Sequence, residues 1–118
     1  MSSLTSRLAV AILIGTATVA TSVSAHHSFA MIDPSKPMRF EGTVKTFQRT
    51  APHPILWIEA GKVGAYAPGL WSLELPTSPG NLSKMGWSRT AVKPGDRVRV
   101  EINPIRDGRR SGQFKKLT

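Results

Sequence analysis

Apolar and polar residues alternate in the stretch MRFEGTVK, residues 38–45. The positions of one face are Met38, Phe40, Gly42 and Val44. Because a β-strand points successive side chains to opposite faces, this stretch predicts a strand with one buried face. The stretch RVRVEI, residues 97–102, alternates in the same way and predicts a second strand of this kind.

Three further segments have the apolar or alternating pattern of strands, and they cover residues 55–58, 71–75 and 113–117. One short helix is predicted between the third and fourth strands in chain order. Ser78 suits its N-cap, Pro79 suits its first turn, and Gly86 suits a left-handed end. The predicted order of elements along the chain is therefore three strands, a helix and then two strands.

Turn signals precede the last two strands, with KPGD at residues 93–96 and DG at residues 107–108. This order of elements predicts an all-β protein with one short helix, built as a small five-stranded OB-like barrel. An open β-roll or sandwich would have the same local pattern, because the pattern indicates strands more directly than it indicates closure.

Residues 1–25 have the pattern of a signal peptide. A basic start is followed by an apolar segment, residues 8–20, and the small residues Val23 and Ala25 precede the expected cleavage site. Threonine and serine interrupt the apolar run, so a transmembrane helix is not expected. We expect a mature protein, residues 26–118, that forms a single small domain and is periplasmic or secreted.

The chain is strongly basic, with 16 Lys and Arg residues against 7 Asp and Glu residues and a formal net charge of +9. Loss of Arg7 with the signal lowers this charge by one, to +8. Cations lie on the polar faces of predicted strands or near the C-terminus, namely Arg39, Lys45, Arg97, Arg99, Arg106, Arg109, Arg110, Lys115 and Lys116. This charge favours an anionic polymer, a membrane surface or an acidic protein as partner, although it also serves solubility. Export disfavours nucleic acid as that partner.

Four motifs of the chain are HHSFAMID at residues 26–33, PH at 52–53, GWSR at 86–89 and KPGD at 93–96. Together they resemble the small exported bacterial proteins of domain of unknown function 6152. Ile32 and Ala51 stand where members of that family usually have an aromatic residue and an asparagine. Because that family has no assigned activity, the resemblance implies an architecture and export, and the function has to be argued from the residues.

The three histidines of the chain, His26, His27 and His53, form a candidate metal site. After cleavage behind Ala25, the free α-amine and the ring of His26 would chelate one ion, and the ring of His53 would supply a third nitrogen. Three nitrogens in a planar arrangement suit Cu(II), so copper is the expected metal. We expect His27 and Met31 as secondary ligands.

Other arrangements of this site remain open. Cleavage after Ser24 would expose Ala25-His26-His27, whose amine, two amides and third-position imidazole also chelate Cu(II). Asp33 is a candidate acceptor that would orient a ligating ring. Alternatively, the histidines are structural, with a frayed N-terminus and no metal. Copper is the one cofactor that the sequence suggests, because the chain has no cysteine and its imidazoles have no acidic cluster beside them.

The sequence does not predict an enzyme. It contains no serine elbow and no phosphate-binding glycine loop, and its carboxylates are scattered over predicted polar faces. Trp57 and Trp71 occupy apolar strand positions and are expected in the core, whereas Trp87 is expected to be the most exposed tryptophan. A stacking face for sugars or bases is their alternative role. We expect a small binding module, with the reservation that a bound copper ion would itself be redox-active.

Overall fold

The computed structural model describes residues 30–118. The elements are strands β1 (Met38–Gln48), β2 (Ile55–Ala60), β3 (Gly69–Glu74), β4 (Arg97–Pro104) and β5 (Ser111–Leu117) and helix α2 (Pro79–Lys84). The predicted signal peptide and the candidate ligands His26 and His27 lie outside the described residues.

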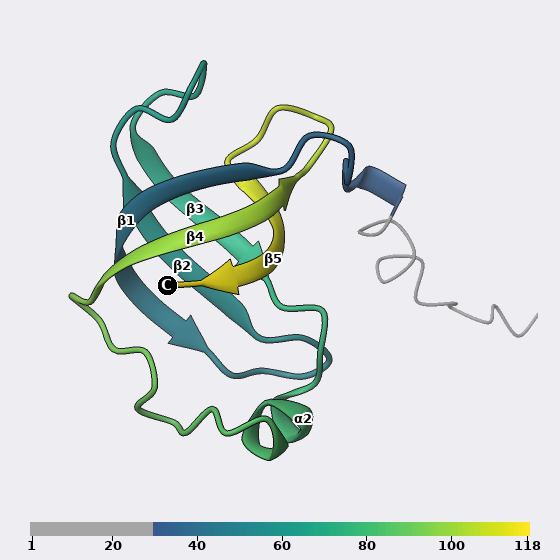
Figure 1. Cartoon of the computed structure of the whole chain (residues 1–118), viewed down its shortest axis with the longest axis vertical. Helices are drawn as coiled ribbons and strands as arrows, with labels where there is room; N and C mark the ends of the chain where they lie inside the picture. Colours follow the sequence, from purple (N-terminus) through teal and green to yellow (C-terminus); the bar gives the residue numbers. More distant parts are fainter. Residues whose placement is uncertain (1–29) are drawn as a thin grey trace, which may run out of the picture.

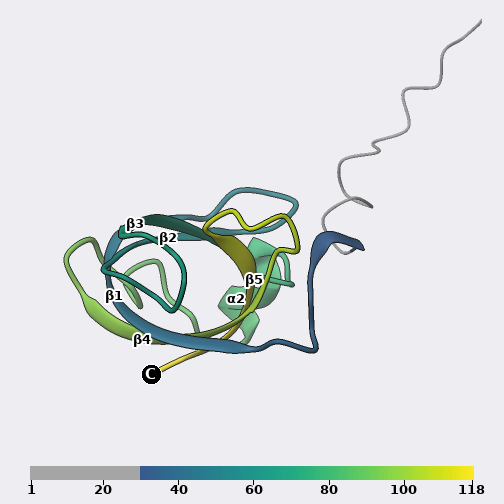
Figure 2. The same cartoon turned by 90° about the horizontal axis from the view of Figure 1, so that it is seen from above.

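The strands form a closed barrel in the order β1-β2-β3-β5-β4 (Figure 1, Figure 2). Neighbouring strands are antiparallel except β3 and β5, which run parallel with Ser72 opposite Ser111. The pairing of β1 with β4 closes the ring, with Met38 opposite Ile102 and Thr43 opposite Arg97. The predicted five-stranded barrel with one short helix is therefore confirmed, and the alternative of an open roll is not.

The core is built by the alternation that the sequence shows. In β1 the side chains of Phe40 and Val44 point inward, and in β4 those of Val98, Val100 and Ile102 do the same. They meet buried residues of the other strands and of α2, which include Leu56, Ile58, Trp71, Leu73, Leu82 and Phe114. Burial of apolar side chains at about 25 cal/mol per Å² is the main stabilising contribution available to this cysteine-free chain.

A register shift between Val44 and Thr46 changes which side chains of β1 face the core. Strict alternation from Val44 would place Phe47 outside, but Phe47 is half-buried and packs against the core cluster. A bulge of this kind adds a residue to one strand and bends it, as a strand that curls around a small barrel requires.

The helix and its neighbouring turn have the ends that the sequence predicts. The Ser78 hydroxyl accepts a hydrogen bond from the backbone N–H of Asn81 at 3.2 Å, and Gly86 follows the helix with a φ of 90°. Gly95 has a φ of 91°, and the N–H of Asp96 donates to the carbonyl of Lys93 as in a type II turn. None of the helices within residues 30–118 is long and apolar enough to cross a membrane.

One tryptophan, Trp57, differs from the sequence prediction. Trp71 is fully buried, as expected. Trp57 points outward, because Leu56, Ile58 and Ala60 take the inward positions of β2. Trp87, expected to be the most exposed, is half-buried and packs with its ring centre 6.0 Å from that of Phe114. The prediction for Trp57 was wrong because the run ILWI is apolar on both faces and does not show which face is inside.

Candidate functional site

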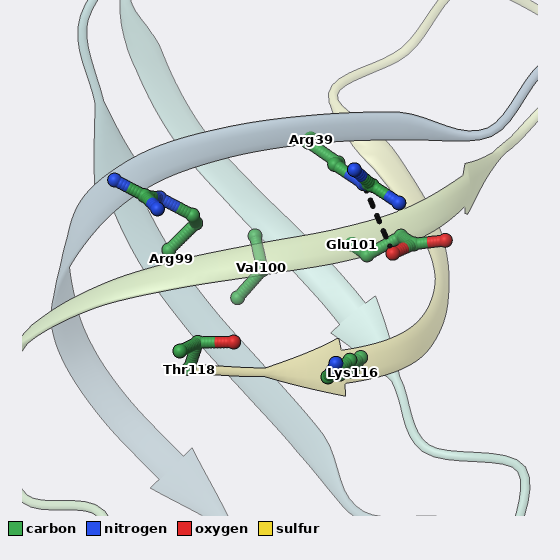
Figure 3. A pocket seen from close by; sticks show the side chains of 6 residues that line it. All are labelled: Arg39, Arg99, Val100, Glu101, Lys116 and Thr118. Atoms are coloured by element: carbon green, nitrogen blue, oxygen red, sulfur yellow. Dashed lines mark hydrogen bonds and ion pairs between the residues drawn. The ribbon is translucent and has the colours of Figure 1, made fainter.

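The outward side chains of β1, β4 and the end of β5 form one wall of the barrel. Its cations are Arg39, Arg97, Arg99, Lys115 and Lys116, and its carboxylates are Glu41 and Glu101; we call this set the basic face. The strand register brings its members together, since Arg39 lies opposite Glu101, Glu101 lies opposite Lys116, and Glu41 lies opposite Arg99. Figure 3 shows part of this face, with the side chains of Arg39 and Arg99 on either side of Val100.

Each carboxylate of the basic face is shared by two cations. Glu41 accepts hydrogen bonds from Arg99 at 2.6 and 3.1 Å and lies 3.7 Å from Arg97. Glu101 lies 3.1 Å from Arg39 and 3.4 Å from Lys115. Exposed ion pairs of this kind contribute at most about 1 kcal/mol each, because water competes for both partners. They position the guanidinium groups more than they stabilise the barrel.

The carboxylates stay ionised at neutral pH. The hydrogen bonds from Arg99 and the positive charge of Arg99 hold the pKa of Glu41 below its usual value. Partial desolvation acts in the opposite direction, and Arg97 adds a smaller lowering effect. Desolvation raises the pKa of Glu101, but Arg39 and Lys115 outweigh it, so this pKa is also lowered. Five cations against two carboxylates leave the basic face with three positive charges in excess.

Two shallow hollows lie on this wall and share Arg99 and Thr118. One has a volume of about 210 Å³ and is lined by Arg39, Arg99, Val100, Glu101, Lys116 and Thr118 (Figure 3). The other has a volume of about 300 Å³ and also contains Glu41 and Arg97. Guanidinium groups at the rim of a hollow offer paired N–H donors to a phosphate, sulfate or carboxylate group. The arrangement can therefore hold an anionic group without a deep pocket.

The two described members of the predicted metal site lie at opposite ends of the barrel. The carbonyl of Met31 accepts from the N–H of Arg106 at 2.6 Å, which fixes Met31 beside the β4–β5 connection. His53 lies in the β1–β2 connection, with its Nδ1 3.3 Å from the carbonyl of Thr77 before α2. Met31 precedes the start of β1 and His53 follows its end, and the 11 residues of β1 cover roughly 35 Å of chain at about 3.3 Å per residue. Met31 and His53 thus do not come together on one ion.

Asp33 has partners of its own. Its carboxylate accepts hydrogen bonds from the hydroxyl of Ser35 at 2.5 Å and from the N–H of Ser35 at 3.1 Å, and it lies 3.7 Å from Arg106. The hydroxyl of Ser35 is the main cause that holds the pKa of Asp33 below its usual value, against a desolvation effect that raises it. Within residues 30–118 no three His, Cys, Asp or Glu side chains are placed to hold a metal ion. The predicted roles of His26 and His27 lie outside the described residues.

Sequence reasoning placed Arg39, Arg97 and Arg99 on polar strand faces but did not bring them together on one wall with Glu41 and Glu101. A signal for the pairing is present in the sequence. When residues 39–41 are aligned antiparallel to residues 99–101, each charge meets one of opposite sign. Such cross-strand pairs favour one register over its neighbours.

Comparison with known proteins gives a family and no function. No curated protein matches the chain, and no solved structure matches it. Residues 14–114 match the Family of unknown function (DUF6152), which covers most of the chain. The protein therefore belongs to the DUF6152 family, as the motifs of its sequence suggested.

Proposed function

We propose that this protein is an exported binding module that uses the basic face to dock on anionic envelope material. The observation that carries the proposal is the excess of cations on one wall, where five Arg and Lys side chains lie with two carboxylates and four of the five pair with them. Cations that served solubility alone would not need to be concentrated on one wall of the barrel. Export itself is supported by the signal pattern of residues 1–25.

The arginines of the basic face are available to an incoming anion. The side chains of Arg39, Arg97 and Arg99 are 76, 68 and 64 % exposed, so an anionic polymer reaches them without moving the barrel. Lys116 has no ion pair within residues 30–118, and Arg97 has only its longer contact with Glu41. A polymer with regularly spaced anionic groups would contact several of these cations at once, which multiplies weak individual attractions.

Replacing Arg97 and Arg99 together by Gln is the direct test. Each cation near an anionic surface contributes about 1 kcal/mol, so the double variant should bind about tenfold or more weakly. The measurement is binding of the purified mature protein to phosphatidylglycerol vesicles and to immobilised alginate. For the unaltered protein, affinity should fall steeply between about 50 and 200 mM salt, because the Debye length shortens over this range.

The matched control removes two positive charges elsewhere, by changing Lys62 and Lys84 to Gln. Lys62 lies in the β2–β3 connection and Lys84 ends α2, so neither belongs to the basic face. This control should keep most of the affinity. Equal losses in both double variants would show that net charge matters and the basic face does not. Binding that ignores salt, or no binding to either anionic material, would contradict the proposal.

A second candidate function is copper binding at the mature N-terminus, which is favoured by two adjacent histidines directly after the expected cleavage site. Because Met31 and His53 lie at opposite ends of the barrel, we propose a site that needs no ligand from His53. The α-amine, His26 and His27 supply the nitrogen ligands, and Met31 remains a candidate thioether ligand.

Copper binding should depend on where the mature chain begins. One extra residue before His26 should change the copper spectrum, because it moves the free amine away from the His26 ring. Affinity should fall as the pH drops through about 6.5, since imidazole binds metal only when it is deprotonated. His53→Ala should leave Cu(II) affinity unchanged. The proposal fails if His53→Ala removes binding or if His26→Ala with His27→Ala does not.

A further inference from the structure

A second outward face lies on the opposite wall of the barrel from the basic face. Figure 1 shows β2 and β3 behind β1 and β4, and Figure 2 shows the two pairs of strands on opposite sides of the barrel. Outward side chains of β2 and β3, with those of adjoining parts of β1 and β5, make up this face. We call it the Trp57 face, and its members are Gln48, Ile55, Trp57, Glu59, Leu70, Ser72, Glu74 and Ser111.

Small residues flank the indole of Trp57 along the hydrogen-bonding direction of the sheet. Trp57 lies opposite Thr46 on β1 and opposite Ser72 on β3, and Ser72 lies opposite Ser111 on β5. Cross-strand neighbours are only about 5 Å apart, so bulky residues there would cover the ring. Hydroxyl side chains are too short to cover it fully, and Trp57 is half-buried. The indole is thus the largest side chain in a row of small hydroxyl-bearing side chains.

The polar groups of this face are held in place by hydrogen bonds. The indole Nε1–H of Trp57 donates to Oε1 of Gln48 at 3.2 Å, which fixes the orientation of the ring. The hydroxyl of Ser72 donates to the hydroxyl of Ser111 at 2.9 Å, and that of Ser111 donates to the Ser72 carbonyl at 3.1 Å. A fixed aromatic ring with ordered hydroxyl and amide groups binds a ligand at a lower entropic cost than mobile side chains do.

The named members of the Trp57 face include two carboxylates and no cation. Glu59 and Glu74 are outward residues of β2 and β3, and neither forms an ion pair within residues 30–118. The sequences of these two strands, ILWIEA and GLWSLE, contain no Lys or Arg. Phosphate polymers would be repelled by the two carboxylates, whereas a sugar hydroxyl can donate a hydrogen bond to each of them.

We infer that the Trp57 face binds an uncharged glycan chain. The apolar C–H face of one sugar ring would stack on the indole of Trp57, because a flat aromatic face fits a flat apolar one. Neighbouring sugar hydroxyls would donate to Glu59 and Glu74 and exchange hydrogen bonds with Gln48. This site is independent of the basic face, so the barrel would contact an anionic surface on one side and a neutral polysaccharide on the other.

Titration with two neutral hexasaccharides tests the inference, one of β-1,4-linked glucose and one of β-1,4-linked N-acetylglucosamine. In a ¹H–¹⁵N spectrum of the mature protein, the indole N–H signal of Trp57 should shift with at least one of them, and that of buried Trp71 should not. Trp57→Ala should weaken binding about tenfold, which is the size of a lost stacking contact. Glu59→Gln with Glu74→Gln should weaken it less, since an amide oxygen still accepts a hydrogen bond.

The control for this experiment is Lys84→Gln, at the end of α2 and in neither face, which should bind the hexasaccharide as tightly as the unaltered protein. Thermal unfolding of Trp57→Ala establishes that the variant is folded. The titration of the unaltered protein tests the inference even if this variant does not fold. If neither hexasaccharide shifted the Trp57 signal, the inference would be overturned. Binding that survives Trp57→Ala, or a Trp57 signal that responds to oligodeoxythymidylate and to neither sugar, would also overturn it.

Discussion

Gly42→Ala is expected to destabilise the barrel by about 3 kcal/mol, although it adds only one methyl group. Gly42 lies in β1 on the inward face, opposite Val98 of β4. A Cβ atom there would overlap Cγ2 of Ile58 and lie 2.6 Å from the backbone carbonyl oxygen of Glu59. Ile58 is fully buried and the carbonyl belongs to β2, so neither can move without disturbing the sheet.

Chemical unfolding of the mature protein would measure this loss as a lower midpoint with an unchanged slope. The matched control is Gly61→Ala, because a Cβ atom at Gly61 meets no atom within 4 Å. The control should change the free energy of unfolding by less than about 0.5 kcal/mol. Equal stabilities of the two variants would mean that β1 and β2 do not approach each other as closely at Gly42 as the structure has them.

The fold was largely predictable because each strand has a recognisable pattern in its own stretch of sequence. Residues 38–45 and 97–102 alternate, and each alternation corresponds to inward and outward side chains in β1 and β4. Gly42 was placed correctly on the inward face, but its close approach to β2 was not predictable from β1 alone. The bulge after Val44 reversed the side on which Phe47 lies. An alternation pattern in the sequence does not show where a strand contains an inserted residue.

The basic face was harder to predict because its contacts join distant parts of the chain. Arg99 bonds to Glu41 across 58 positions, and Arg39 bonds to Glu101 across 62. Only closure of the barrel brings these residues together. The Trp57 face was missed for a different reason, since tryptophan in an apolar run looks the same whether it faces the core or the solvent. The predicted His26 and His27 ligands remain a prediction.

Trp71→Ala should be the most damaging change to a single side chain of the core, with a loss of about 3 to 5 kcal/mol. Trp71 is fully buried, and its ring centre lies 4.7 Å from that of Phe40 and 4.9 Å from that of Tyr66. Truncation to alanine removes both aromatic contacts and leaves a cavity between β1 and β3 that surrounding side chains fill only in part. The free energy of unfolding, measured with urea, gives the loss directly.

Two further variants separate packing from hydrogen bonding at this position. The indole Nε1 of Trp71 is buried and has no hydrogen-bond partner within residues 30–118. Trp71→Phe keeps an aromatic ring and removes that unpaired donor, so it should destabilise the barrel clearly less than Trp71→Ala. Trp57→Ala, on the outer face of β2, should cost only about 1 kcal/mol, because it opens no cavity. If Trp57→Ala were as destabilising as Trp71→Ala, Trp57 would be part of the core after all, and its indole could not serve as the platform for a glycan.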